Sequence, residues 1–434
     1  MRIVTPPTDG SMQLRDIDLT DVRLYTDGDA HLAWRTLRAE EPVFWQKRAR
    51  GEGFWVVTRW SDVRRVLADY RAFTSERGTA ISMLDSVDPS AGRMMQATDP
   101  PRQVALRRSL AAPLDGRSAE KQRARVRSLV EDTLRSLLEH ETCDIAAAFS
   151  RLPVAVAAML MGLPDRDIDD LKDLAYRALA PADPAFSIGS ESLTASAGRI
   201  GLLRYFSNCV RDRRRKSSND LVSHMLTAQV DGAYLSNEDV LLNCLSFMLG
   251  AVVTTSHAIS ATMLALAGSD GGEGRWPTQA SLPDVVEEAL RWASPITHFM
   301  RRARADTEIR ETKIAQGDAV TAWIASANRD SAIFRTPDAL DLTRKPNRHI
   351  AFGSGAHQCI GADMARLMLT ESFAGLMRYV ECFELAGEVR HLASNEIAGI
   401  VNLPLSIKVR RSTVQPRTAL RQSTAQFPGQ ARTP

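Results

Sequence analysis

Hydrophobic residues recur at helical spacing over most of this chain and alternate as in strands only in short segments. Between 30 and 73, a helical pattern (HLAWRTLRAEE), a strand pattern (FWVVTR) and a second helical pattern (SDVRRVLADYRAF) follow one another. From 102 to about 268 the pattern is almost wholly helical. It breaks only at Gly-, Pro- or Ser-containing turns at 162–164, 181–184 and 217–220.

Strand patterns return only after Pro295, where 308–324 surrounds a Gly-Asp turn. The segment 363–380 (DMARLMLTESFAGLMRYV) then predicts a strongly amphipathic helix. The whole pattern is typical of a mainly α protein with a minor β-sheet region.

The longest apolar run, 240–269, contains no charged side chain. Ser236 and Asp239 form a capping-box-like start and Gly268 marks an end, so the run predicts one helix of about 45 Å. Its centre, LGAVVTTSHA, has four consecutive β-branched residues and is a poor helix interior. The run could span a bilayer, but its many polar side chains and acidic borders favour a buried helix. We therefore expect no membrane contact.

Composition is that of a globular protein, with 44% hydrophobic and 25% charged residues among 434. No repeat or compositional break divides the chain, so we expect an N-terminal arm (1–20), a single domain (21–410) and a flexible tail (411–434). The tail is basic, but it lacks the interleaved aromatics of a nucleic-acid-binding segment, and we expect no such partner.

Cysteine usage and the N-terminus both favour a cytoplasmic protein. The N-terminus, MRIVTPPTDGSMQLRD, has no apolar signal region. The five cysteines are widely spaced without a C-x-x-C pair, which argues against a disulfide framework. They stand at positions 143, 209, 244, 359 and 382.

The segment HIAFGSGAHQCIGADMARL, 349–367, carries the densest candidate chemistry. A dinucleotide loop would require glycine where Gln358 stands, and a zinc site or Cys-His nucleophile would have only His357 and Cys359. A buried structural cysteine is the simplest alternative. The remaining interpretation is thiolate ligation of haem iron, because loop N–H groups and the following helix N-terminus would stabilise the sulfur's negative charge.

FGSGAHQCIG matches every fixed position of F-G-x-G-x-H-x-C-x-G, so the chain resembles the cytochrome P450 family. The resemblance covers about residues 20–410. It implies the cytochrome P450 fold, a haem b cofactor and Cys359 as the iron ligand. It also places Phe352, Gly353, His357 and Gly361 around the haem.

Two further segments are similar to family motifs. EEALRWASP implies a buried ion pair of Glu288 with Arg291, and Ala339 stands where a basic residue usually joins this pair, so Arg344 is the candidate substitute. DPPRQVALRR is similar to the stretch that precedes the propionate-facing helix, with Gln103 where histidine is common. The resemblance makes Gln103 a cofactor-binding position. It also implies that Arg107, Arg301 and His357 hold the propionates.

LGAVVTTSHA aligns with the family's A-G-x-[DE]-T-T segment. The alignment implies that Gly250 and Ala251 make room for oxygen and that the Thr254 hydroxyl donates to it. Val253 stands where the family has a proton-relaying acid. A water chain through Thr254 and Thr255, a polar substrate group, or chemistry without normal oxygen activation could replace that acid.

The resemblance implies a monooxygenase that inserts oxygen from O2 into a small molecule, by hydroxylation in bacterial secondary metabolism. The alternatives are peroxide-driven oxidation, phenol coupling or use of another small oxidant, a haem-based sensor, and a cysteine-nucleophile hydrolase. We expect a monomer that receives electrons from a ferredoxin and its reductase, with docking near Arg107, Arg108 and Lys345. The expected substrate contacts are Ile81, Met83, Leu84, Phe247, Ile296, His298, Phe299, Ile400 and Val401.

Overall fold

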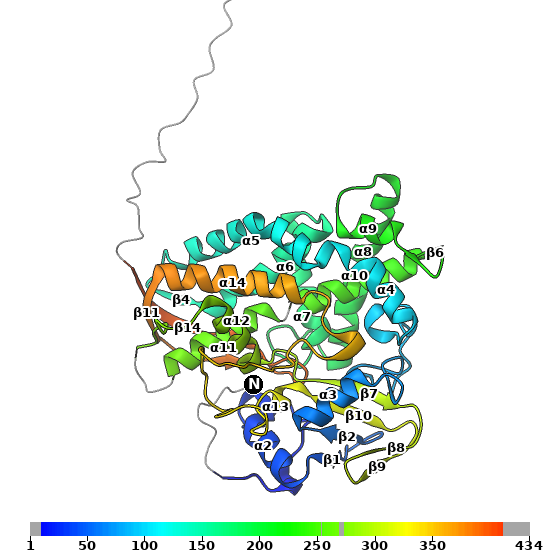
Figure 1. The fold of residues 1–434 in the computed structure, drawn as a ribbon. Helices are drawn as coiled ribbons and strands as arrows, with labels where there is room; N and C mark the ends of the chain where they lie inside the picture. Colours follow the sequence, from blue (N-terminus) through cyan, green and yellow to red (C-terminus); the bar gives the residue numbers. More distant parts are fainter. Residues whose placement is uncertain (1–9, 253, 269–272, 411–434) are drawn as a thin grey trace, which may run out of the picture.

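Helices fill most of the molecule, and the five-stranded main sheet lies at one end, as the computed structural model shows for residues 10–252, 254–268 and 273–410 (Figure 1). The helices are α1 (Arg23–Thr26), α2 (Ala30–Glu40), α3 (Trp60–Ala68), α4 (Arg102–Leu110), α5 (Gly116–Leu137), α6 (Ile145–Met161), α7 (Ile168–Leu179), α8 (Glu191–Arg215), α9 (Leu221–Thr227), α10 (Asn237–Val252), α11 (Thr255–Gly268), α12 (Leu282–Ala293), α13 (Ile324–Ala327) and α14 (Ala362–Tyr379). Short 3-10 helices include η2 (Ile81–Met83) and η6 (Gly355–His357).

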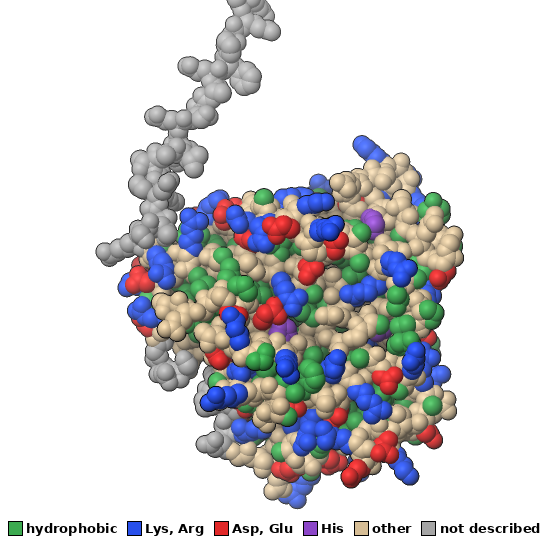
Figure 2. Space-filling model, in the orientation of Figure 1, with side chains coloured by type: hydrophobic (Ala, Val, Ile, Leu, Met, Phe, Trp, Pro, Cys, Tyr) green, Lys and Arg blue, Asp and Glu red, His purple; other side chains and the backbone are tan. Residues whose placement is uncertain are grey.

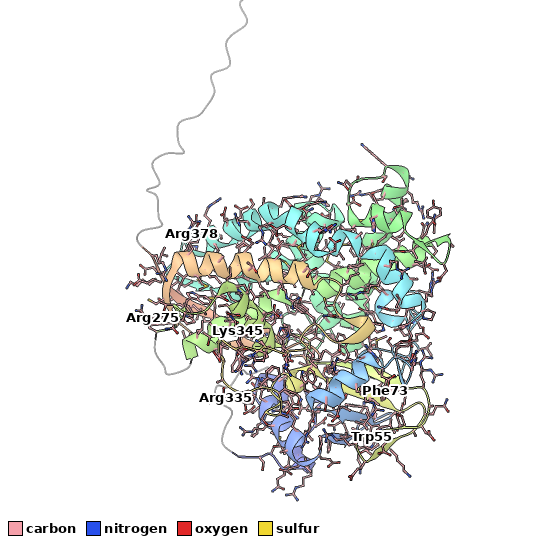
Figure 3. All side chains as sticks on the ribbon, viewed as in Figure 1. Trp55, Phe73, Arg275, Arg335, Lys345 and Arg378 are labelled. Carbon is pink, nitrogen blue, oxygen red and sulfur yellow. The ribbon has the colours of Figure 1, made fainter. Side chains whose placement is uncertain are left out.

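The main sheet has the strand order β1-β2-β10-β7-β3. Strand β2, from the N-terminal part of the chain, pairs in parallel with β10, from the C-terminal part. The other neighbouring strands of this sheet are antiparallel. Trp55 on β2 and Phe73 on β3 mark this sheet in Figure 3. The strands are β1 (Val43–Gln46), β2 (Phe54–Val57), β3 (Phe73–Thr74), β4 (Thr142–Asp144), β5 (Gln229–Val230), β6 (Ala233–Tyr234), β7 (His298–Ala303), β8 (Thr307–Ile309), β9 (Thr312–Ile314), β10 (Ala319–Trp323), β11 (Val380–Leu385), β12 (Arg390–His391), β13 (Ile400–Asn402) and β14 (Pro404–Val409).

The mainly α architecture with a minor sheet confirms the sequence prediction. Within the predicted 240–269 helix, α10 and α11 are both helical, and Val253 between them lies outside the described residues. One detail of the prediction was wrong. The stretch from 102 to 268 contains β4 and the β5–β6 hairpin, whose pairing depends on tertiary contacts. The expected tail, 411–434, lies outside the described residues.

Helix α12 shows how local sequence positions a site residue. Ser281 caps its first turn by accepting from the Asp284 N–H, and Ser294 ends it in the left-handed region at φ 40°. Its apolar face packs into the core that also includes α5, α6, α11 and α14. The same inward orientation carries two charged residues, Glu288 and Arg291, into the interior.

Helices α10 and α11 together are long and apolar enough to cross a membrane by length and composition alone. In this structure, 53% of their most apolar window is buried within the chain. α10 packs with α6, α7 and α8, and α11 packs with α6, α12 and α14. Apolar helices packed against several others in this way are typical of the core of a globular protein.

Close packing of α7 against α8 depends on Gly198. A Cβ there would lie 2.5 Å from the Leu174 carbonyl oxygen, whereas a Cβ at Gly201 would meet only the flexible end of the Leu174 side chain. We predict that Gly198→Ala lowers stability by about 1–3 kcal/mol because two backbones must separate. Gly201→Ala is the matched control, since its gain in helix propensity offsets its milder clash. Thermal unfolding measures both; equal melting temperatures for the two variants would contradict this account.

Candidate functional site

The loop before α14 holds Cys359 in a fixed backbone frame. Gly353 and Gly355 adopt φ values of 74° and 75°, which favour glycine. A Cβ at Gly355 would lie 2.6 Å from the Ala68 Cα, so the loop packs directly on α3. The Cys359 N–H donates to the Phe352 carbonyl at 2.8 Å and closes the loop. These constraints present the Cys359 side chain at one end of α14.

Cys359 is exposed, whereas Cys244 and Cys382 are buried. Loss of water around the thiol raises its pKa, and the Gly361 N–H and the charge of Arg107 act in the opposite direction. The same N–H and positive charge would stabilise a thiolate. No group of three His, Cys, Asp or Glu among the described residues is placed to hold a metal. A metal here would therefore take Cys359 as its protein ligand.

Polar side chains from three elements converge beside this cysteine. Gln103 of α4 donates to the Ala356 carbonyl at 2.8 Å, and Arg107 of the same helix donates to the Gln358 carbonyl at 2.5 Å. Arg301 of β7 and Arg107 are both close enough to His357 to lower the pKa of its imidazole, after burial, to about 3. The structure thus brings together the three side chains that the sequence analysis assigned to the propionates, with Gln103, the further cofactor-binding candidate, beside them.

Arg301 is a buried cation that lacks a carboxylate partner within ion-pair distance among the described residues. It is 3% exposed, and its guanidinium donates to the Met300 carbonyl at 2.8 Å. Burial lowers its pKa to about 10. The buried Gln103 Oε1 also has no hydrogen-bond partner in the described part of the chain. A buried guanidinium beside an exposed cysteine fits a flat iron cofactor that carries carboxylates.

Glu288 and Arg291 form a fully buried ion pair with two parallel bonds of 2.7 Å. Arg344 approaches the same carboxylate at 3.1 and 3.2 Å, so it contacts Glu288 where the family would use a residue at position 339. Asn347 adds a bond of 3.1 Å. Ala339 contributes its carbonyl, which accepts from Arg291 at 3.0 Å.

The backbone at the end of α10 is accessible. Gly250 is exposed, and a Cβ added there would meet nothing within 4 Å. Ala251 is half-buried, and Thr254 is half-buried in the turn between the helices. Thr255 is buried at 2% exposure. Val253 lies outside the described residues.

The expected substrate contacts divide into two groups. Phe247, Ile296 and Val401 stay partly exposed and pack, together with Ala251, against one core cluster. Ile360, the neighbour of Cys359, packs against the same cluster. The others lie elsewhere. Ile81 and Leu84 pack in the core of the sheet-bearing end, Ile400 is buried, and Met83 and Phe299 are half-buried.

His298 faces the interior of the sheet-bearing end. Its ring lies 4.4 Å from that of Trp323, and its Nδ1 is 3.0 Å from the Thr297 hydroxyl. Burial lowers its pKa to about 3, so the imidazole is neutral. These contacts pack His298 within its own sheet, while its buried Nε2 has no hydrogen-bond partner among the described residues, and its contact with substrate stays a prediction.

Sequence reasoning missed a hydrogen-bond chain behind His357. The His357 Nε2 lies 2.9 Å from the Ser75 hydroxyl, which donates to the Asp99 carboxylate at 2.7 Å. Since that hydroxyl's proton is committed to Asp99, the Ser75 oxygen accepts from a protonated His357 Nε2. Asp99 opens the D-P-P stretch, which is the only sequence signal for this chain.

Comparisons with known proteins show what the whole chain is similar to. The family model described as "Cytochrome P450" matches residues 281–411. Cytochrome P450 NovI of Streptomyces niveus is 34% identical over 93% of this chain and 99% of its own, and linalool 8-monooxygenase of Pseudomonas putida is 29% identical over 89% and 97%. P450 OxyD, described as involved in the biosynthesis of vancomycin-type antibiotics, has 35% identity and a TM-score of 0.79 over 91% of this chain and 100% of its own. A Mycobacterium marinum cytochrome P450 crystallised with pseudoionone has 26% identity and a TM-score of 0.81 over 90% and 98%.

The buried carboxylate of Glu288 balances the charges of Arg291 and Arg344, so its loss should destabilise the fold. We predict that Glu288→Ala lowers stability by about 3–5 kcal/mol, because it leaves Arg291 and Arg344 buried without their counter-charge. Asp132→Ala is the control, since its pair with Arg135 is exposed and is worth at most about 1 kcal/mol. Thermal unfolding and the yield of folded protein measure the difference. Similar losses in both variants would contradict the assigned weight of the buried network.

Proposed function

Since this chain belongs to the cytochrome P450 family of haem-dependent monooxygenases, we propose that it hydroxylates an intermediate of bacterial antibiotic biosynthesis. The observation that carries this proposal is the exposed Cys359 in a loop whose His357 lies near the buried cation Arg301, which has no carboxylate partner within ion-pair distance among the described residues. NovI and OxyD, at 34% and 35% identity across nearly the whole chain, support the metabolic setting. The alternatives of a sensor and of a cysteine-nucleophile hydrolase lack such support.

We assign the haem contacts from the residues that fit them, with haem b as the cofactor. Cys359 supplies the thiolate, and the Gly361 N–H and the charge of Arg107 stabilise it. Arg301, Arg107, His357 and Gln103 supply cationic and hydrogen-bonding groups for two propionates. The bound haem iron supplies oxygen activation and transfer of one oxygen atom to the substrate.

At the end of α10, small side chains and a hydroxyl line the space that we assign to the reaction. Gly250 and Ala251 keep the α10 backbone accessible, and Thr254 at its end holds a proton on its hydroxyl. Phe247, Ile296 and Val401 give an apolar border for a small organic substrate. Thr254 is the proton donor that we assign to oxygen activation.

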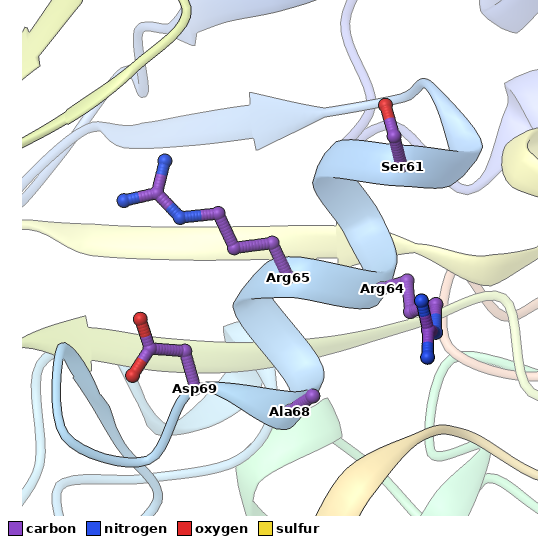
Figure 4. A pocket seen from close by; sticks show the side chains of 5 residues that line it. All are labelled: Ser61, Arg64, Arg65, Ala68 and Asp69. Carbon is purple, nitrogen blue, oxygen red and sulfur yellow. The ribbon is translucent and has the colours of Figure 1, made fainter.

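A redox partner would meet the face that carries the cysteine loop. Lys and Arg side chains are spread over this face (Figure 2). Arg64 and Arg65 line a hollow on α3, beside which the loop packs through Gly355 (Figure 4). Arg108 is exposed, whereas Lys345 (Figure 3) is tied to Asp284 at 2.8 Å. We propose an acidic ferredoxin and its reductase as partners of a monomer in the cytoplasm.

A second candidate function follows from the apolar residue at position 253. Valine cannot relay a proton, so peroxide-driven oxidation, phenol coupling or use of another small oxidant would suit a site without this acid. Val253→Asp separates the two functions. It should raise the fraction of electrons that reach product if oxygen activation is proton-limited, and unchanged coupling would favour the second candidate.

Thiolate ligation predicts a specific spectrum. We expect the reduced, carbon monoxide-bound protein to show the long-wavelength Soret band of thiolate-ligated haem, and Cys359→Ser to lose it. Cys143→Ser, altered in the distant strand β4, is the control and should retain the band. If Cys359→Ser kept the long-wavelength band, the assignment of the ligand would be wrong.

The role assigned to Thr254 predicts how electrons divide between product and released peroxide. A library of small molecules is first screened for the compound that causes the largest low-to-high spin shift of the haem iron on binding. With that compound as substrate, Thr254→Ala should divert reducing equivalents from product to released peroxide. The control is Thr262→Ala, whose hydroxyl donates to the Ala258 carbonyl at 2.8 Å. Product formation and peroxide release per nicotinamide oxidised are the measurements. Normal coupling in Thr254→Ala would indicate that the substrate delivers the proton.

A further inference from the structure

Three polar residues are buried directly after Thr254. Thr255, Ser256 and His257 are 2%, 1% and 2% exposed. Other hydroxyls of α11 bond back to the helix: Ser260 donates to the Ser256 carbonyl, and Thr262 to the Ala258 carbonyl. The hydroxyls of Thr255 and Ser256 have no such partner in the described structure. A buried hydroxyl without a partner costs about 1–3 kcal/mol, so these two are suited to binding water.

His257 has a defined hydrogen-bonding direction. Its Nδ1 accepts from the Ile400 N–H at 3.4 Å, and burial lowers its pKa to about 4. The neutral ring therefore carries its proton on Nε2, which lies 3.4 Å from the Tyr176 hydroxyl. The packing is tight, because a Cβ at Gly399 would lie 2.8 Å from Nε2. The ring is thus held with its N–H towards Tyr176.

Tyr176 continues the polar line into α7. Its ring stacks on Phe186 at 4.5 Å, which fixes the position of the hydroxyl. Because the hydroxyl oxygen accepts from His257, its own proton can be donated to another oxygen. Burial raises the pKa of the phenol, and the Ser256 hydroxyl is close enough to lower it by hydrogen bonding. The two hydroxyls can therefore exchange a proton directly.

The line reaches the surface through an ion pair. The Asp183 charge acts on Tyr176, and its carboxylate, which is fully buried, is 3.0 Å from Arg390. The side chain of Arg390 is 44% exposed. Asp183 also accepts from the Ala393 N–H at 2.9 Å, which ties the pair to the segment that follows β12. Only the charge of Asp183, and no hydrogen bond among the described residues, links it to Tyr176, so ordered water would complete this step to solvent.

We propose that Thr255, Ser256 and Tyr176, with ordered water and with His257 orienting the Tyr176 hydroxyl, form a proton route from the Asp183–Arg390 pair to the Thr254 hydroxyl. It would supply the protons that a carboxylate at position 253 would otherwise relay. Each transfer breaks one O–H bond and forms another, and a proton taken up from solvent at Asp183 replaces the one that Thr254 gives up, so every hydroxyl returns to its neutral state. The inference rests on the proposed function, since it assigns Thr254 as the donor.

Tyr176→Phe and Ser256→Ala test the route, because each removes a hydroxyl and keeps the rest of the shape. With O2 and the spin-shifting library compound, we expect product formed per nicotinamide oxidised to fall by about tenfold. The solvent deuterium isotope effect on turnover should rise. Tyr205→Phe, which loses a hydroxyl bonded to Asp167, and Ser260→Ala are matched controls and should match the parent protein.

Two measurements separate a proton route from a packing role. Hydrogen peroxide brings its own protons, so peroxide-driven turnover should be equal in Tyr176→Phe and the parent; a parallel loss would overturn the proposal. A high-resolution crystal structure of the haem-loaded protein should show water bonded to the Thr255 and Ser256 hydroxyls. A dry, apolar contact there would also overturn it. If Thr254→Ala is uncoupled while Tyr176→Phe is normal, the route alone fails. Normal coupling in Thr254→Ala would refute Thr254 as the proton donor, and absence of the long-wavelength Soret band in the parent protein would refute the proposed function itself.

Discussion

The buried carboxylate of Glu288 is the constraint on which the cysteine side of the molecule depends. Between α13 and η6 the chain has no regular helix or strand in the described structure, so its carbonyls need donors from elsewhere. Arg291 donates to the carbonyls of Asn328, Pro337 and Ala339 while it pairs with Glu288. Arg344 bonds the same carboxylate and the Arg335 carbonyl. A buried ion pair is weak evidence of net stability, but this one defines the path of an irregular segment.

That path determines where the cysteine loop lies. The segment enters the loop through Ile350, whose N–H donates to the Asn328 side chain at 2.8 Å, and Gly355 then packs on α3. Helix α4, strand β7 and the loop consequently place Arg107, Arg301 and His357 around one position. None of the three elements could assemble this group of donors alone. The cofactor chemistry of the chain therefore depends on the folding of segments that are far apart in sequence.

Sequence analysis predicted the parts of this arrangement that are local. The cysteine loop and the buried Glu288–Arg291 pair were implied by the resemblance of short motifs to the family, and α14 and α2 follow from hydrophobic periodicity. The approach of Arg344 to Glu288 was inferred only as a substitute for the missing basic residue at 339, because residues 56 positions apart meet through an irregular path. The Ser75–Asp99–His357 chain and the core packing of Ile81 and Leu84 could not be predicted. They depend on how loops from different parts of the chain fold over one another.

The weak centre of the apolar run has a structural consequence. The chain places β-branched and hydroxyl residues, which weaken a helix, where α10 ends and α11 begins. Gly250 leaves one side of α10 open, and Thr255 and Ser256 bury unpaired hydroxyls on entering α11. Each choice lowers stability at the same point, while the surrounding core of apolar side chains supplies the burial that tolerates it. Local weakness beside a well-packed core is what a site that must admit oxygen, substrate and protons requires.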